Sequence, residues 1–139
     1  IRDIRNQGKT VVLTTHYMEE AQILCDRIAI IDSGKIIAEG TPAQLIHQLD
    51  YQFRIIYRGK TCVDDKVIGK ITGIVSQKHE YNEQTKMYSC IFGVKKVQDV
   101  LPKIISALQK KKLPFEDLEV IPGSLEDVFL KLTGKDLRD

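Results

Sequence analysis

The sequence contains Lys9-Thr10-Val11-Val12-Leu13-Thr14-Thr15-His16, followed at once by Tyr17-Met18-Glu19-Glu20-Ala21. The continuous apolar run at 10–15 is typical of a strand buried on both faces of a parallel sheet. The two acids that follow favour the first turn of a helix, where negative charge is stabilised. We therefore expect His16 at the carboxyl end of a strand, the edge of an open parallel sheet where ligands bind. A lone histidine there also fits a plain helix entry or a polar cap.

The composition is that of a folded protein of one ordinary domain or two small ones. The chain has 139 residues, 42% of them hydrophobic, and a net charge of +2, which is too mild to indicate nucleic acid or an anionic membrane as a partner. Cys25, Cys62 and Cys90 are widely spaced and form no C-x-x-C motif, which favours reduced thiols over a disulfide framework or a structural zinc site. No run of about 18 apolar residues is present, so we expect no membrane insertion.

Residues 1–50 predict the end of an α/β sheet. The chain opens in helical register, and we interpret residues 1–7 as the end of a helix, stopped by Gly8, and the chain as a fragment. Turn residues 32–35 predict a hairpin. The sequence Thr41-Pro42-Ala43-Gln44 is typical of a capping box that opens a helix. The predicted elements are the strand 10–15, a short helix from residue 18, the hairpin strands 27–31 and 36–39, and a helix at 42–49.

A domain boundary is expected at Asp50, where continuous apolar strands give way to alternating ones. We therefore divide the chain into residues 1–50 and residues 51–139. The second part predicts strands at 51–58, 71–78, 86–93 and 114–121, an ambiguous short helix within 62–70, and a main amphipathic helix at 97–111 with Pro102 near its start. Ser124-Leu125-Glu126-Asp127 is a second capping box that opens a last helix, which Gly134 ends. This order is that of a small α+β ferredoxin-like domain with a C-terminal addition.

The sequence has no complete active site of its own. It contains no glycine-rich phosphate loop, no nucleophile elbow and no H-E-x-x-H helix. His16, His47 and His79 are too distant in sequence to indicate a local metal site, and His47 is expected on a solvated helix face. Glu19 and Glu20 are neighbours on a helix, where they point in different directions, so a joint acid–base role is not expected.

The first part resembles the end of the ATPase domain of ABC transporters. The resemblance rests on G-K-T-V-V-L-T-T-H-Y-M-E-E-A and C-D-R-I-A-I-I-D-S-G-K-I-I-A-E-G-T-P and covers residues 1–49. It implies that His16 is the switch histidine, which contacts the γ-phosphate of ATP and helps to hold the attacking water. An imidazole suits this task because it can donate a hydrogen bond as charge develops on a phosphoryl oxygen.

The same resemblance implies the setting of the protein. The intact parent would bind ATP and Mg²⁺ and work with a transmembrane permease subunit at the inner face of the cell membrane, in the cytoplasm. The phosphate loop, the signature motif and the catalytic glutamate of the family have no counterpart in this sequence. We therefore expect no cofactor on the fragment, and no ATP hydrolysis by it alone.

Residues 51–139 resemble the extra C-terminal domain of drug, polysaccharide and lipid exporters in this superfamily, most specifically at 124–134. The resemblance implies a role in dimerisation or regulation, and unpaired strand edges in residues 1–50 also predict a homodimer or a strand-exchanged assembly. One alternative is a non-enzymatic ferredoxin-like module that regulates or binds a small ligand. An RNA-binding sheet would need aromatic residues that 86–92 do not supply, so we expect no nucleic-acid partner.

Overall fold

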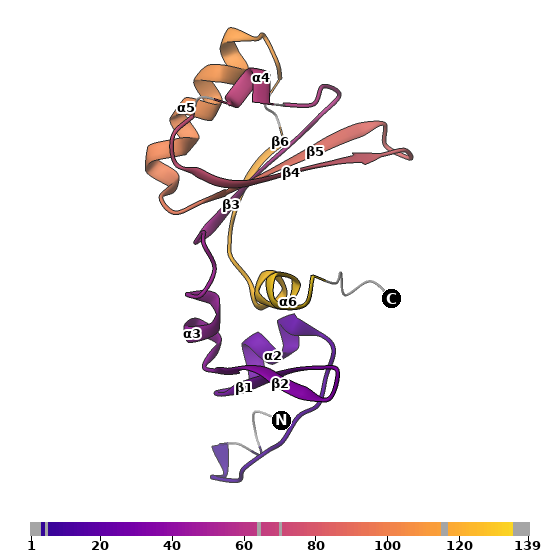
Figure 1. Cartoon of the computed structure of the whole chain (residues 1–139), viewed down its shortest axis with the longest axis vertical. Coiled ribbons are helices and arrows are strands. Elements are labelled where there is room, and N and C mark those ends of the chain that lie inside the picture. The colour runs from indigo at the N-terminus through magenta and orange to yellow at the C-terminus, as the bar shows by residue number, and fades with distance from the viewer. Residues whose placement is uncertain (1–3, 5, 64, 70, 115–116, 135–139) are drawn as a thin grey trace. The chain divides into compact units, whose positions relative to one another are not determined.

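The computed structural model describes residues 4, 6–63, 65–69, 71–114 and 117–134 (Figure 1). These residues form two compact units. The first consists of the described residues of Ile1–Leu49 and Ser124–Asp139, and the second is Asp50–Gly123. One division between the units falls at residue 50. Residues from Ser124 onward group with the first unit, whereas the sequence-based division assigned them to one domain with residues 51–123.

The first unit contains a β-hairpin, with helices both before and after it in sequence. Its hairpin turn contains Ser33 at φ 49° and Gly34 at φ 76°, the left-handed conformations that a two-residue hairpin turn requires. The hairpin and its turn are therefore as predicted, with one register shift between Ile30 and Ile31. The elements are α2 (Met18–Leu24), β1 (Ile28–Asp32), β2 (Lys35–Gly40), α3 (Pro42–Ile46) and α6 (Leu125–Thr133).

The strand predicted at 10–15 is wrong for this structure. None of these residues lies in a strand, and within the described part of the chain β1 and β2 pair only with each other. A continuously apolar strand is stable when neighbouring strands satisfy its backbone and both of its faces are covered. The chain supplies no such neighbours here, and Val12 is 90% exposed. The helix predicted at 1–7 lies largely outside the described residues.

Both predicted capping boxes are confirmed. The Thr41 hydroxyl accepts the Gln44 amide hydrogen bond at 3.2 Å, and the Gln44 side chain accepts from the Thr41 amide at 2.9 Å. At α6 the Ser124 amide donates to Asp127 Oδ2 at 2.8 Å, and Ser124 Oγ accepts from the Asp127 amide at 3.3 Å. Each box satisfies backbone donors that a helix start leaves without intrahelical partners. Gly134, at φ 65°, ends α6 in the left-handed conformation that favours glycine.

Helix α6 completes the core of the first unit. The Leu125 amide donates to Oε1 of Gln22 on α2 at 3.0 Å, and Lys131 Nζ donates to the Gln48 carbonyl at 3.0 Å. Leu125 and Val128 are buried on the side of α6 that meets α2 and α3. Packing and these hydrogen bonds therefore join α6 to segments of the first unit that lie about 100 residues earlier in the sequence. The buried apolar residues of this unit are Ala21, Ile30, Leu45, Leu49, Leu125 and Val128.

The second unit is a four-stranded antiparallel sheet with two helices. The strands stand in the order β4-β5-β3-β6, and each neighbouring pair is antiparallel. Figure 1 shows α4 and α5 on the same face of this sheet. The elements are β3 (Phe53–Gly59), α4 (Asp65–Ile68), β4 (Ile74–Asn82), β5 (Met87–Val94), α5 (Val97–Lys110) and β6 (Asp117–Pro122). Each lies close to its predicted range, and Pro102 falls in the second turn of α5.

The core of the second unit lies between the sheet and α5. Alternate residues of β3 and β5 point to the helices, which follows from the two-residue period of a strand. Their apolar partners on α5 recur every three or four residues, as the helical period predicts. The buried cluster comprises Ile55, Tyr57, Val63, Ile68, Cys90, Phe92, Val94, Val100, Ile104 and Leu108.

Across the described ranges, no helix has both the length and the apolar character needed to cross a membrane.

Candidate functional sites

His16 lies in an exposed bend directly before α2. Its ring stacks against Tyr17, with ring centroids 4.2 Å apart and planes tilted by 35°. Thr15 holds the bend, because its Oγ1 accepts the Tyr17 amide at 3.0 Å and donates to Glu20 Oε2 at 3.2 Å. The histidine is thus presented to solvent at a helix start. Its position before the helix is as predicted, whereas the strand that was expected to precede it is absent.

The exposed imidazole of His16 can accept or donate a hydrogen bond to a ligand. The chain brings no phosphate-binding loop to it, because the sequence has none. The neighbouring hydroxyl of Thr15 is engaged with Glu20. The bend therefore presents the His16 imidazole to solvent, and further groups would have to come from elsewhere to complete a catalytic site. His47 is the exposed C-terminal cap of α3, as expected from its solvated face.

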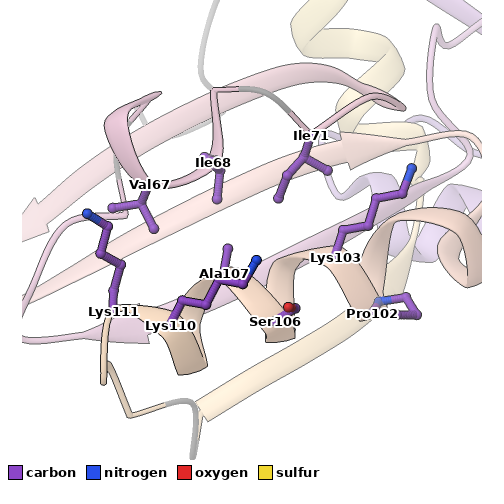
Figure 2. Close-up of a pocket in the computed structure, with 9 residues that line it drawn as sticks. All are labelled: Val67, Ile68, Ile71, Pro102, Lys103, Ser106, Ala107, Lys110 and Lys111. Atoms are coloured by element: carbon purple, nitrogen blue, oxygen red, sulfur yellow. The ribbon is translucent and has the colours of Figure 1, made fainter.

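A pocket of about 490 Å³ lies between α4 and α5 in the second unit. Figure 2 shows Val67, Ile68 and Ile71 facing side chains of α5 across it. Ala107 and Pro102 add apolar surface on the α5 side. This gives the pocket an apolar interior, which is the usual character of a small-ligand site.

The rim of this pocket is basic. The nine described residues that line it include Lys103, Lys110 and Lys111 and no acidic side chain (Figure 2). Lys103 Nζ donates to Thr72 Oγ1 at 3.1 Å and lies 3.5 Å from the Thr72 carbonyl. An apolar interior under a basic rim fits a small ligand with an apolar body and an anionic end.

Two cysteines and a histidine meet at one end of the second unit. Cys62 Sγ lies 3.9 Å from Cys90 Sγ, and the ligand atoms of Cys62, His79 and Cys90 all lie within 4.8 Å of one another. Cys90 is buried on β5, Cys62 is half-buried in the loop after β3, and His79 is exposed on β4. Within the part of the chain that the structure describes, this is the one group of three that could hold a metal ion.

Spacing along the chain does not reveal this group, because its three residues are far apart in sequence. Cys90 and His79 are direct partners in the antiparallel β4–β5 register, and the loop after β3 brings Cys62 close to them. The strands predicted at 71–78 and 86–93 leave His79 in the turn, whereas the observed strands extend further and pair His79 with Cys90. Nothing in the sequence pattern points to Cys62, which lies in an irregular loop.

Tyr57 lies beside this group and is fully buried. It pairs with Cys90 in the β3–β5 register, and its hydroxyl finds no hydrogen-bond partner among the described residues. Burial raises the pKa of Tyr57 above 10.0, and a negative charge on Cys90 raises this pKa further. Gly59 is required beside it, since a Cβ at that position would collide with the tyrosine hydroxyl. The phenol is therefore held neutral in a tightly packed place.

Comparison with known proteins gives matches along the whole chain. A Nod factor export ATP-binding protein I of Ralstonia nicotianae is 32% identical over 140 residues, which cover 100% of this chain and 41% of the relative. The proteins of the same name from Rhizobium etli and Sinorhizobium fredii are each 34% identical, over 99% and 100% of this chain and 39% and 37% of their own lengths. No protein-family model matches the chain.

These matches confirm the resemblance found in the sequence. Over its whole length the chain is related to the ATP-binding subunits of ABC-type exporters. It spans about two fifths of the length of the curated relatives that it matches. The relatedness extends through both compact units, because the alignments include residues of the hairpin unit and of the four-stranded sheet alike.

Proposed function

We propose that this chain serves as part of the ATP-binding, ATP-hydrolysing subunit of an ABC exporter, with His16 as its switch histidine. The observation that carries the proposal is the match along the entire chain to relatives named as export ATP-binding proteins. The motif Thr14-Thr15-His16 and the exposed position of its imidazole before α2 support the assignment of the residue.

His16 would act by hydrogen bonding to the γ-phosphate of ATP, whose Mg²⁺ neutralises the developing phosphoryl charge. The bend held by Thr15 keeps the ring at the surface, where it can reach a nucleotide. The phosphate loop and the catalytic carboxylate must come from residues that this sequence does not contain. The 139-residue chain by itself is therefore expected neither to bind ATP tightly nor to hydrolyse it.

A hybrid protein tests the role of His16. The matching segment of the Ralstonia nicotianae relative is replaced by this chain, and ATP hydrolysis is measured with the unaltered relative as reference. The hybrid with His16 should hydrolyse ATP, and His16→Ala should lower kcat by at least about 100-fold, the loss typical of removing a donor that stabilises transition-state charge. His47→Ala is the matched control, because His47 is also exposed in the first unit. Equal activity of the two variants would refute the role.

We further propose that the second unit is a ferredoxin-like accessory domain. Its elements follow the order strand, helix, strand, strand, helix, strand, and β4 and β6 stand at opposite edges of the sheet. Strand β5 lies between β3 and β4, which the split βαβ arrangement of this fold requires. Such a domain can regulate or dimerise the subunit without taking part in phosphoryl transfer.

Self-association of the 139-residue chain is a separate proposal. The hairpin strands β1 and β2 have no other strand beside them among the described residues, and open edges pair readily with a second copy. Large apolar side chains are exposed on the same unit, including Val12, Ile23, Ile31 and Ile36. Light scattering at micromolar concentration should give the mass of a dimer, which Ile31→Lys should shift toward the monomer. A monomeric mass for the unaltered chain contradicts the proposal.

In the intact subunit, we place the chain beside a transmembrane partner at the cytoplasmic face of the cell membrane. The support is the relatedness to export ATP-binding proteins, which act together with membrane-embedded subunits in this superfamily. The relatives' longer sequences would supply the surfaces that cover the apolar side chains of the first unit. Co-purification of the hybrid with the relative's membrane subunit tests the assignment, and loss of the membrane subunit from the hybrid argues against it.

A second candidate function is a small-ligand-binding module, which the basic pocket between α4 and α5 favours (Figure 2). Decanoate is a suitable probe because it joins an apolar chain to one negative charge, and decylamine is its charge-reversed control. Decanoate should raise the Tm of the 139-residue chain and Lys110→Glu should abolish the rise. The same rise with decylamine would show that the lysines play no part.

A further inference from the structure

The cluster of Cys62, His79 and Cys90 combines two soft ligands with one imidazole. Thiolate sulfur and imidazole nitrogen are the ligands that Zn²⁺ prefers in proteins, and two cysteines with one histidine leave a fourth position for water. The three residues come from three different segments, namely the loop after β3, the edge strand β4 and the buried strand β5. We propose that these side chains form a zinc site that clamps the loop to the sheet.

The distances between the ligand atoms carry this proposal. Zinc–sulfur bonds are about 2.3 Å long, so two sulfurs on one tetrahedral ion stand about 3.8 Å apart. The Cys62 and Cys90 sulfurs are 3.9 Å apart. A sulfur and an imidazole nitrogen on the same ion stand about 3.6 Å apart, whereas the cluster's ligand atoms lie within 4.8 Å of one another. The two sulfurs are therefore placed for an ion, and the distance from the imidazole nitrogen to a sulfur needs to shorten by about 1.2 Å at most.

The surroundings permit that approach and hold the sulfurs. His79 is exposed on an edge strand, and its ring meets Phe92 edge-on with ring centroids 6.4 Å apart, so it can turn about its side-chain bonds. Cys90 Sγ accepts the Val63 amide hydrogen bond at 3.4 Å, which holds the sulfur in place. Such bonds to a ligand atom orient it and tune its affinity for metal.

The burial of the ligands gives the ion an entry path and a dry side. Cys90 is fully buried in the core, whereas Cys62 is half-buried and His79 is exposed. An ion can thus enter from solvent past His79 and Cys62 and bind Cys90 on the buried side. The hydroxyl of Tyr57, the register partner of Cys90, is a buried donor without a described partner on the same side of the sheet. A buried polar group without a partner commonly marks a place where a ligand completes the hydrogen bonding.

A disulfide between Cys62 and Cys90 is the competing use of the same pair. It would need two sulfurs only and would leave His79 without a role. The convergence of the imidazole on the two sulfurs is what favours a metal ion. Zn²⁺ bound here would close a loop between Cys62 and Cys90, which lie 28 positions apart in sequence, and such a closure stabilises a small fold by restraining its unfolded state.

The test uses the full 139-residue chain, kept reduced with a phosphine reductant and stripped with a chelator. Titration with Zn²⁺ should show one ion per chain, and Co²⁺ in its place should give the strong near-ultraviolet absorption of thiolate-to-cobalt charge transfer. Zinc should also protect two of the three cysteines from alkylation, with Cys25 remaining reactive. Uptake of no ion, or an absorption spectrum without charge transfer, would overturn the proposal.

Two variants assign the ligands, and neither alters the buried core cysteine. Cys62→Ser and His79→Gln should each weaken zinc binding by at least about 100-fold, since loss of a group that only supports a ligand already costs up to that much. Cys25→Ser and His47→Gln are the matched controls and should bind zinc as tightly as the unaltered chain. Unchanged affinity in His79→Gln would overturn the proposal, as would equal losses in the control variants. Circular dichroism of each metal-free variant establishes that it is folded.

Discussion

The two units of the chain differ in how completely they satisfy their own strands and apolar side chains. The second unit closes a four-stranded sheet over a buried cluster of ten residues, and its helices cover the apolar face of that sheet. The first unit has a lone hairpin, and it exposes large apolar side chains such as Val12 and Ile23. The second unit can therefore fold by its own contacts, whereas the first unit is suited to packing against further protein.

Separating the units should have the largest effect. Residues 50–123 expressed alone are expected to unfold cooperatively, because the sheet and its core lie within that segment. Residues 1–49 alone are expected to show no cooperative transition, since they lose α6 and its contacts with Gln22 and Gln48. Thermal circular dichroism and dispersion of amide NMR signals measure both outcomes. A folded 1–49 segment would contradict the contrast between the units.

The next largest difference between the units is expected in the free energy of unfolding when one apolar side chain in each is truncated. Phe92→Ala is expected to lower the free energy of unfolding by about 3–5 kcal/mol, because it empties a fully buried position. Val12→Ala is expected to change it by no more than about 0.5 kcal/mol, as the side chain is 90% exposed. Urea denaturation of the full chain measures both values. Similar losses at the two positions would mean that Val12 is covered in solution.

The cap of α6 should have a smaller effect, of about 1 kcal/mol. Ser124→Ala removes the hydroxyl that accepts the Asp127 amide at the start of the helix. The loss should appear in the unfolding of the first unit, whose core contains Leu125 and Val128. Ser106→Ala on α5 is the control, because Ser106 is an exposed mid-helix residue. If the two substitutions destabilise equally, the capping box contributes nothing specific.

The smallest effect is expected at Tyr57, and its sign is opposite. Tyr57→Phe removes a buried hydroxyl without a described partner, so the chelator-treated chain should become more stable by up to about 1 kcal/mol. The pKa of Tyr57 is raised above 10.0 by burial and then by Cys90, so the unfolded chain loses this proton first as pH rises. Stability should therefore fall above pH 10, and less so in Tyr57→Phe.

Denaturation midpoints between pH 8 and about 11 measure this difference. Tyr81→Phe is the control, because Tyr81 is exposed on β4. A variant Tyr57→Phe that is less stable than the parent at neutral pH would show that the hydroxyl has a partner in solution.

Local chemistry made much of the fold predictable. Some features depend only on residues that are close together in sequence. They are the turn at Ser33 and Gly34, the two capping boxes and the amphipathic face of α5. The strand at 10–15 was wrong because a strand depends on its neighbours, which the apolar pattern alone does not supply. The placement of α6 in the first unit also depends on distant contacts, with Gln22 and Gln48.

The candidate sites also differ in how far they could be predicted from local sequence. His16 is proposed from a motif that is continuous in sequence, and its position before α2 follows from the helix signal. The Cys62, His79 and Cys90 cluster depends on the register of a hairpin and on the path of a loop, so spacing along the sequence could not reveal it. The pocket between α4 and α5 depends on the packing of two helices that sequence periodicity describes only singly.

The path of the chain through its two units determines whether the second unit can be exchanged or removed as one piece. The second unit is an insertion, since the chain leaves the first unit after Leu49 and returns to it at Ser124. Its two ends are held together, because the Gly123 amide donates to the Gln52 carbonyl at 2.8 Å. An inserted module whose ends meet can be exchanged or excised as one piece and replaced by a short turn. The second unit could thus have been gained or lost in a single genetic event while the last helix kept its place.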